Sequence, residues 1–280
     1  MSAANTRCLV ALGGNVGNVA ETFEAALGEL TAGSTDCQSV LLGRISTNFS
    51  TPAVGSQAGG GFLNAAAEVV TTLSPLELLR RLQEIEASHG RDRGRMRVVP
   101  LLDGRRSDVS LDETRSRRPS SSATAAWQPR TLDLDLILYG DQVIDTPELH
   151  VPHPACWYRR FVLDPLVEIA ADAIHPVKQA TFGELRSRLI PRPLTVAVTG
   201  GKSGQCAELA QRLSDEFPAA TFHPNWSPGS ELPALLPWLG PGPNDDAAFD
   251  SLPLLPRLDV SAADEALAFL RSVVQAALGE

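Results

Sequence analysis

Two periods of apolar residues divide the first part of the chain into predicted strands and helices. Runs rich in Val, Leu and Ile that are continuous or alternating are typical of strands. Strands are predicted at Arg7 to Leu12, Ser39 to Asn48 and Phe62 to Thr72. The loop between the last two, Ser50 to Gly61, is rich in glycine and can approach a ligand closely, because glycine has no side chain.

Apolar positions three and four residues apart predict helices between these strands. Val19 to Leu30 has one apolar face, and we expect Asn18 to cap it with Glu21 completing a capping box. A second helix is predicted to run from the cap Ser74-Pro-Leu-Glu77 to about Ser88, because an N-cap serine, a proline and a glutamate stand there in the preferred order.

Two carboxylates, Asp133 and Asp135, interrupt an otherwise apolar strand that is predicted at Thr131 to Tyr139. Side chains of a strand alternate between faces. One face should therefore carry Thr131, Asp133, Asp135, Ile137 and Tyr139, and the opposite face Leu132, Leu134, Leu136 and Leu138. Two residues of rise place the aspartate Cα atoms roughly 7 Å apart, close enough to share one Mg²⁺ or to bracket two. Hard oxygen ligands on a rigid strand suit Mg²⁺.

An Asp-x-Asp pair is also typical of the solvated face of an edge strand, so its neighbours matter. Pro129 and Arg130 come immediately before this strand and bring a phosphate-matching guanidinium close to the acids. A cation beside metal ligands favours a polyphosphate substrate. Glu86 falls within the buried stripe of its helix and would need a partner there, unless it is a surface residue at a frayed helix end.

Composition restricts the class of protein. The chain has 280 residues, enough for one domain and a smaller second one, with 43% hydrophobic and 20% charged residues. A net charge of −9 argues against a nucleic-acid partner, and no apolar run approaches the roughly 20 residues that span a bilayer. Without a signal-like N-terminus, a cytoplasmic location is expected. Four scattered cysteines indicate reduced thiols rather than zinc ligands or disulfides.

A small α/β domain is predicted at residues 194–280. Its elements are expected to be a strand at Leu194 to Thr199, a glycine turn at Gly200 to Gly204, a helix at Cys206 to Phe217, a strand at Leu258 to Val260 and a helix at Ala262 to Leu278. Gly201-Lys-Ser203 matches the end of a P-loop, but Val196 stands where the first glycine is required. We therefore expect a degraded P-loop-like segment of unknown role.

Several motifs stand in a single order along residues 8–190. They are Ala11 to Asn15, Ser50 to Gly55, Phe62 to Ala66, Gln83 with Glu86, Gly90 to Arg93, Pro129 to Leu136, Val151 to His153, Arg159 with Phe161, and Leu166 to Ala170. Together they resemble the 6-hydroxymethyl-7,8-dihydropterin pyrophosphokinase family. The resemblance implies an α+β fold for residues 1–190, in which helices cover a ferredoxin-like antiparallel sheet. It also implies transfer of pyrophosphate from ATP to the hydroxymethyl group of 6-hydroxymethyl-7,8-dihydropterin, with release of AMP, in folate biosynthesis.

The same resemblance implies roles for individual residues. Asp133 and Asp135 would hold two Mg²⁺ ions during in-line attack on the β-phosphorus of ATP. The implied catalytic and phosphate-binding residues are Arg91, Arg93, Arg130, Arg159 and His153, and the implied nucleotide contacts are Gln83, Glu86 and Leu136. The implied pterin pocket is formed by Asn15, Thr51, Pro52, Val54, Phe62, Asn64, Trp127 and Phe161.

The chain departs from the family pattern in the loop expected to close over ATP. Arg93 and Trp127 are separated by 33 residues, where the family has only a handful. We expect residues 95–126 to be a mobile, arginine-rich insertion. Ala126 and Gln128 also replace the basic residue and the glycine that usually flank the tryptophan.

Two alternative functions remain open on the sequence. One is a protein that binds nucleotide or pterin but has lost turnover through the altered loop. The other is a bifunctional protein whose C-terminal domain is a nucleoside kinase. The sequence favours a reduced, interface-forming or binding module over an active kinase in that domain.

Overall fold

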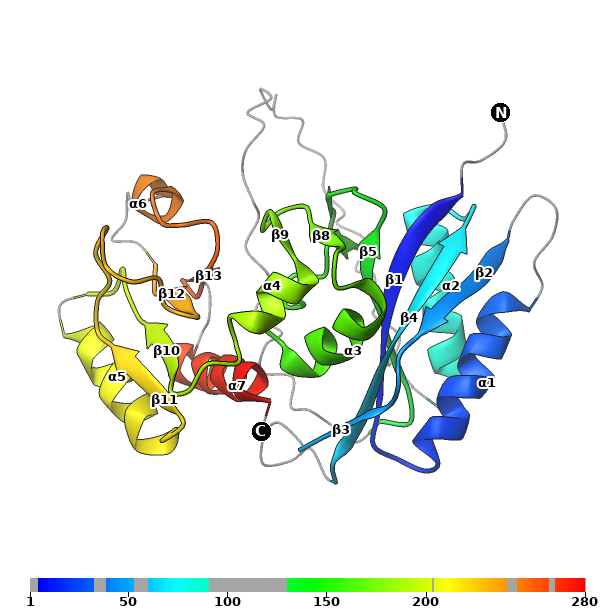
Figure 1. Cartoon of the computed structure of the whole chain (residues 1–280), viewed down its shortest axis with the longest axis horizontal. Coiled ribbons are helices and arrows are strands. Elements are labelled where there is room, and N and C mark those ends of the chain that lie inside the picture. The colour runs from blue at the N-terminus through cyan, green and yellow to red at the C-terminus, as the bar shows by residue number, and fades with distance from the viewer. Residues whose placement is uncertain are drawn as a thin grey trace, which may run out of the picture.

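The computed structural model describes residues 5–32, 39–52, 60–90, 130–202, 204–240, 246–261 and 265–279. Within these ranges the first half of the chain forms one antiparallel sheet flanked by helices (Figure 1). Its elements are β1 (Thr6–Gly14), α1 (Val19–Thr31), β2 (Val40–Ile45), β3 (Phe49–Thr51), β4 (Phe62–Thr71), α2 (Pro75–Ser88) and β5 (Asp133–Tyr139). The strand order is β2-β4-β1-β5, with β3 also paired to β4. This β-α-β-β-α-β arrangement is ferredoxin-like, which confirms the predicted fold class.

The sheet is covered on both faces (Figure 1). Helices α1 and α2 lie on one face and α3 (Arg160–Ala170) on the other. Alternate residues of β1 decide which core each side chain joins: Val10 and Leu12 pack with α1 and α2, whereas Leu9 and Ala11 pack with α3. Asp133 therefore lies on the α3 face of the sheet, because it pairs with Gly13, two residues from Ala11, and a Cβ on Gly13 would lie 3.8 Å from Asp133 Cβ.

The two predicted helix starts have different outcomes. At α2 the Ser74 hydroxyl accepts from the Glu77 N–H, and the Glu77 carboxylate accepts from the Ser74 N–H at 2.8 Å, so the predicted capping box is confirmed. At α1 Asn18 is the N-cap residue, but its side chain makes no capping bond. The predicted capping box with Glu21 is therefore wrong, although the position of the helix start is right.

Strand β5 does not alternate along its whole length. Val10 of β1 pairs with Leu136, but Leu9 pairs with Leu138, so Ile137 is an extra residue and forms a β-bulge. The predicted alternation holds through Ile137. It is wrong for Leu138 and Tyr139, which lie on the faces opposite to those expected because the bulge exchanges the faces.

Short elements connect the sheet to the C-terminal segment. They are β6 (Ile144–Asp145), β7 (His150–Val151), β8 (Ile174–His175), β9 (Ala180–Thr181) and α4 (Phe182–Ser187). A second capping box, between Thr181 and Glu184, starts α4. Helices α3 and α4 pack against each other, and α3 also contacts β4.

The C-terminal segment forms a small parallel sheet. Its elements are β10 (Leu194–Ala197), α5 (Gln205–Glu216), β11 (Ala220–His223), β12 (Leu236–Trp238), α6 (Asp246–Asp250), β13 (Arg257–Asp259) and α7 (Ala266–Leu278). Strand β10 pairs with β11, and bridges at Val196 and Thr199 join it to the β12 side, so the order is β11-β10-β12-β13. This confirms the predicted α/β character. Strands β11 and β12 were not predicted; β12 lies in a proline-rich stretch that hides its strand pattern.

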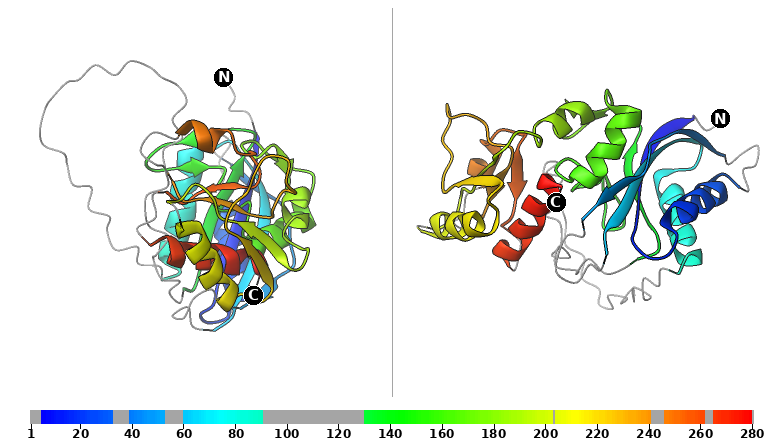
Figure 2. Two further views of the ribbon diagram at one scale, coloured as in Figure 1. Left: turned by 90° about the vertical axis from the view of Figure 1, so that its left-hand side faces the viewer. Right: turned by 60° about the horizontal axis from the view of Figure 1, so that its bottom comes forward.

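One hydrophobic core continues from the α3 face of the first sheet into the C-terminal segment. It joins Leu163 and Leu166 of α3 to Val196 of β10 and to Leu270 and Val274 of α7. In the right view of Figure 2, α7 (red) lies between the parallel sheet and the first half of the chain. A boundary near residue 194 therefore stays a prediction about sequence organisation, since buried side chains pack across it.

Across the described ranges, no helix has both the length and the apolar character needed to cross a membrane.

Candidate active site

Asp133 and Asp135 lie half-buried at the start of β5, next to β1. Asp133 pairs with Gly13 and Asp135 with Ala11, so both acids stand beside the smallest side chains of β1. Arg130 donates from Nη1 to Asp133 Oδ2, and both side chains are about one-fifth exposed, at 24% and 19%. The structure thus brings together the predicted guanidinium and the first of the two predicted acids.

Asn64 lies on the other side of the same glycine. It pairs with Gly13 from β4, and a Cβ built on Gly13 would lie 3.5 Å from Asn64 Oδ1. The Asn64 amide donates to the Thr51 hydroxyl at 2.8 Å, which joins β4 to β3. Gly13 therefore separates a buried amide from a carboxylate, and no side chain of its own fills the space between them.

Asn15 fixes the segment that carries Arg130. Its side-chain oxygen accepts from the Arg130 N–H at 2.9 Å, and its own N–H donates to the Arg130 carbonyl at 2.9 Å. Its amide nitrogen also donates to the Gly60 carbonyl at 3.3 Å. Asn15 was predicted to line the pterin pocket; in the structure it ties together two segments that border the site.

Gly14 allows the same segment to approach β1. A Cβ on this residue would lie 2.6 Å from the Thr131 carbonyl oxygen and 2.9 Å from Val19 Cγ1, closer than real contacts allow. Thr131 in turn donates from its hydroxyl to the His89 carbonyl at the end of α2. The chain therefore leaves α2 and returns to β5 at neighbouring points.

His153 is placed beside the acids by the β-bulge. The Ile137 carbonyl accepts from the His153 N–H at 3.1 Å, so the bulged residue bonds to the histidine segment. His153 Nδ1 accepts from the Ala155 N–H at 3.2 Å, which leaves the ring proton on Nε2. Burial lowers the pKa of His153; Asp135 opposes this shift and Arg159 adds to it. A neutral ring with an Nε2–H donor follows.

Arg159 and Phe161 flank the first residue of α3. The Arg159 carbonyl accepts from the Val162 and Leu163 N–H groups at 3.0 and 2.9 Å, which begins the helix. The Arg159 guanidinium carbon lies 5.7 Å from the centre of the Phe161 ring. Tyr158 is hydrogen-bonded to Arg159, and burial raises the pKa of that tyrosine. A cation and an aromatic ring thus lie next to each other at the start of α3.

Three residues predicted as nucleotide contacts lie on α2 or, for Leu136, point from β5 toward the core formed with α1 and α2. Glu86 is completely buried, and its Oε1 accepts from the Leu134 N–H at 2.9 Å, between the two aspartates. Leu136 is 3% exposed and packs in the core with α1 and α2, so any contact at this position involves its backbone. Gln83 is half-buried on α2. The sequence argument that Glu86 needs a partner is confirmed by its bond to Leu134.

Other predicted site residues are distributed as follows. Phe62 is 7% exposed at the start of β4, and Pro52 is exposed just after β3. The remaining ones, Arg91, Arg93, Val54 and Trp127, lie outside the described residues, as does the predicted insertion at residues 95–126.

The family model for 7,8-dihydro-6-hydroxymethylpterin-pyrophosphokinase, HPPK, matches residues 9–111 and 107–171, more than half of the chain. The chain belongs to this family. The 2-amino-4-hydroxy-6-hydroxymethyldihydropteridine pyrophosphokinase of Synechocystis sp. is 33% identical over 177 residues, which cover 63% of this chain and 73% of that protein. The protein of the same name from Bacillus subtilis is 34% identical over 180 residues, covering 64% of this chain and 86% of that protein.

Among solved structures, a crystal structure of HPPK-DHPS in complex with substrates aligns with 84% of this chain at 10% identity and a TM-score of 0.40. The chain covers 57% of that longer protein. The HPPK family model ends at residue 171, before β10 begins. The resemblance inferred from the motifs is therefore confirmed for the family, and the parallel sheet lies beyond the matched region.

Two features of this HPPK site were missed by sequence reasoning. Gly13 and Gly14 directly follow the strand predicted at Arg7 to Leu12, but the closeness of their neighbours depends on residues of β4, on Asp133 of β5 and on the Thr131 backbone. The bulge at Ile137 gave no signal, because an extra isoleucine leaves an apolar strand apolar. The Gly-Gly-Asn sequence directly after a buried strand is the one signal that could have indicated a close approach of two segments.

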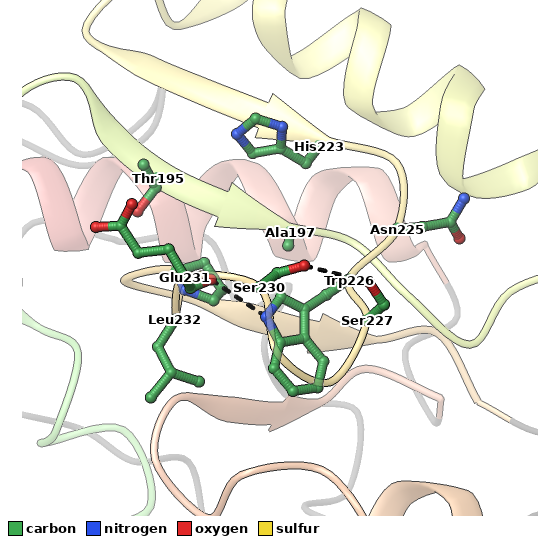
Figure 3. Close-up of a pocket in the computed structure, with 10 residues that line it drawn as sticks. Thr195, Ala197, His223, Asn225, Trp226, Ser227, Ser230, Glu231 and Leu232 are labelled. Carbon is green, nitrogen blue, oxygen red and sulfur yellow. Dashed lines mark hydrogen bonds between the residues drawn. The ribbon is translucent and has the colours of Figure 1, made fainter.

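A separate pocket of about 340 Å³ lies in the C-terminal segment beyond the HPPK match (Figure 3). It is formed by β10, the end of β11 and the loop that follows β11, with Trp226 as its aromatic wall. Trp226 Nε1 donates to the Glu231 carbonyl at 3.2 Å, which closes the loop. Among the described residues that line it, Glu231 is the acid and no lysine or arginine is present.

Proposed function

We infer that this chain performs the reaction of its family, and we propose which described residues carry it out. The reaction transfers pyrophosphate from ATP to the hydroxymethyl group of 6-hydroxymethyl-7,8-dihydropterin and releases AMP, a step of folate biosynthesis. The proposal rests on one observation above all: Gly13 has Asn64 on one side and the Asp133–Arg130 pair on the other.

Asp133 and Asp135 are proposed to hold two Mg²⁺ ions. Their carboxylates are the hard oxygen ligands this ion prefers, and they share one strand face. Mg²⁺ is usually held by one or two carboxylates, and water and substrate phosphates complete its coordination. When bound, Mg²⁺ neutralises charge on the phosphate oxygens during transfer.

Arg130, Arg159 and His153 are proposed to bind the phosphates of ATP. Arg130 already contacts Asp133, so the guanidinium lies where phosphate oxygens would meet the metal-binding acid. The charges of Arg159 and of both aspartates act on the pKa of His153, which supports a site that contains all four side chains. Neutral His153 offers an Nε2–H donor without adding another charge. Arg91 and Arg93 remain proposed phosphate ligands on sequence grounds.

The nucleotide contacts proposed on α2 and β5 are Gln83, Glu86 and Leu136. For Glu86 the structure supplies a further reason for its presence, because it satisfies an N–H on the outer edge of β5. This bond fixes Leu134 and hence the direction of the acids on either side. Leu136 would contribute backbone groups only, since its side chain is in the core.

The pterin is proposed to bind on the far side of Gly13 from Asp133. Asn64, held by Thr51, would read the hydrogen-bonding edge of the ring, and Phe161 would stack on its face. The remaining proposed members of this pocket are Asn15, Thr51, Pro52, Val54, Phe62 and Trp127. With the pterin there, its hydroxymethyl group points toward the phosphates held by the acids.

The deciding experiment incubates the protein with ATP, Mg²⁺ and 6-hydroxymethyl-7,8-dihydropterin and measures AMP. Asp133→Ala and Asp135→Ala should each reduce AMP formation by about 10³-fold or more, because the metal ligands are lost. Asp141→Ala is the matched control, since Asp141 is an exposed acid in the turn after β5. ATP binding without AMP release would overturn the enzymatic assignment and favour a binding protein.

A second kinase site in the C-terminal segment is not favoured. Gly200 has a positive φ of 77°, and a Cβ there would lie 2.2 Å from the Trp238 ring, so close packing explains this glycine without a ligand. The pocket of Figure 3 also presents a carboxylate rather than cations among its described lining residues. Nucleotide phosphates would be repelled there.

A further inference from the structure

We propose that the C-terminal segment holds the turn before α3 in place, and that Arg160 is the positioning residue which transmits this to the active site. The proposal rests on the function proposed for Arg159 and Phe161, between which Arg160 stands. It gives a role in the reaction to residues beyond the HPPK match. Four contacts support it.

The first contact joins α3 to the end of α7. Arg160 donates from Nη1 to the Leu278 carbonyl at 3.2 Å and from Nη2 to Asp164 Oδ2 at 2.9 Å. A guanidinium at the C-terminus of a helix also interacts favourably with the helix dipole. One side chain therefore connects the last turn of α7 to the first turn of α3.

The second contact brings the backbones close. Gly279 ends α7 with a positive φ of 76°, and a Cβ there would lie 3.4 Å from both Cβ and Nη1 of Arg160. A larger residue at this position would be strained by the positive φ, and its Cβ would lie in van der Waals contact with Arg160. Arg192 also donates to the Leu278 carbonyl, at 2.9 Å, which anchors the same end of α7 from the linker.

The third contact lies on the other side of the turn. Lys178 donates from Nζ to the carbonyls of Leu254 and Arg257 at 3.1 and 2.9 Å, and Nζ lies 4.0 Å from the centre of the Trp157 ring. Trp157 is 3% exposed and contacts Tyr158 edge to face. The turn is therefore held at Trp157 as well as at Arg160.

The fourth contact is the shared core. Trp157, Tyr158 and Val162 belong to the same buried cluster as Leu270, Val273 and Leu278 of α7. Figure 2 shows α7 lying alongside the first half of the chain, and α3 contacts α7 directly. Both ends of the turn that carries Arg159 are thus packed against the C-terminal segment.

The contacts of Arg160 stabilise the fold less than a fully hydrogen-bonded guanidinium would. Its Nε is buried without a hydrogen-bond partner among the described residues, which costs free energy. Its two acceptor groups have other donors as well: Arg186 donates to the other oxygen of the Asp164 carboxylate, Oδ1, at 2.7 Å, and Arg192 donates to the Leu278 carbonyl. Removing the guanidinium therefore leaves the Asp164 carboxylate and the Leu278 carbonyl each with one donor, and the variant should fold.

The test compares Arg160→Met with Arg271→Gln in the full chain. Arg271 lies on α7 and is paired with Glu216 of α5. Its variant therefore breaks an ion pair within the C-terminal segment, away from the turn before α3. Arg160→Met should raise the Michaelis constants of both ATP and pterin by about tenfold, because small misplacements of binding groups are costly. The increase in both Michaelis constants should be smaller in Arg160→Lys, which keeps a cation, and absent in Arg271→Gln.

Hydrogen exchange provides a readout that does not depend on activity. The N–H groups of Val162 and Leu163 bond to the Arg159 carbonyl, so they report on the turn itself. They should exchange about tenfold faster in Arg160→Met and in Lys178→Met, but not in Arg271→Gln. Unchanged exchange and unchanged Michaelis constants in both variants, or equal effects in the control, would overturn the proposal. A wild-type chain that releases no AMP would defeat the proposed function alone, and exchange would still decide whether the C-terminal segment holds the turn.

Discussion

Asn64 and Asp133 approach each other across Gly13, which pairs with one of them on each side. A Cβ on Gly13 would lie 3.5 Å from Asn64 Oδ1 and 3.8 Å from Asp133 Cβ, both ordinary contact distances. A methyl group therefore fits in the unliganded protein. It would occupy the space where the two substrates are proposed to meet.

Gly13→Ala should consequently separate folding from activity. We expect the free energy of unfolding to change by less than about 1 kcal/mol, with kcat/KM for the pterin falling about tenfold or more. Gly14→Ala is the comparison, because its Cβ would lie 2.6 Å from the Thr131 carbonyl and should cost about 2 kcal/mol. Denaturant unfolding and AMP assays measure the two effects. A Gly13→Ala enzyme with full activity would contradict the proposed meeting point.

Glu86 allows a test of two roles for one residue. If its main task is to accept from Leu134, Glu86→Gln should keep stability and most activity, since the amide oxygen also accepts. Glu86→Ala would leave a buried N–H unpaired and should cost about 2 kcal/mol. Glu84→Ala, an exposed residue of the same helix, is the control. An increase in the Michaelis constant of ATP for Glu86→Gln, at unchanged stability, would instead support a direct nucleotide contact.

Local signals along the chain were sufficient for much of the fold. The Ser74-Pro-Leu-Glu77 cap and the helical spacing after Val19 correspond to α2 and α1, because capping and amphipathicity depend only on near neighbours. The alternation of β5 predicted correctly that Leu134 and Asp135 lie on opposite faces. It failed beyond Ile137, because a bulge depends on register with β1 and has no local pattern.

The site was predictable in its residues more than in its geometry. The acids and Arg130 are adjacent in sequence, and their contact follows from that. The positions of Asn64 and His153 relative to Asp133 depend on strand pairing and on a backbone bond to Ile137, which the sequence does not display. The contact between α3 and α7 could not be predicted either, since it connects residues more than a hundred positions apart.

The described residues on either side of the segment that contains the long insertion lie close together, which permits the segment to be shortened. Thr131 bonds to the His89 carbonyl, and a Cβ on Gly90 would lie 3.9 Å from Thr131 Oγ1. After deletion of residues 97–123, the residues that remain between Gly90 and Thr131 are enough to span the short distance between them. Shortening a loop changes the entropy of loop closure only slightly. If the insertion serves ATP, the Michaelis constant of ATP should rise severalfold while pterin affinity measured by titration stays the same. Unchanged kinetics would indicate that the insertion has no part in catalysis.

His175 should make the protein less stable in acid. It is 3% exposed, and burial lowers its pKa from 6.5 to about 4. Between these values the unfolded chain binds more protons than the folded one, so the free energy of unfolding decreases as pH falls, by at most about 3 kcal/mol from this group. His175→Asn keeps an acceptor for the Lys178 N–H, which bonds to His175 Nδ1 at 3.1 Å, and cannot be protonated in this range. In urea titrations the variant should therefore lose less stability between pH 6.5 and 4 than the unmodified chain does. Replacing the exposed His223 by Asn is the control, and it should leave the loss the same as in the unmodified chain. Equal pH slopes for His175→Asn and the unmodified chain would show that His175 is not the group that titrates.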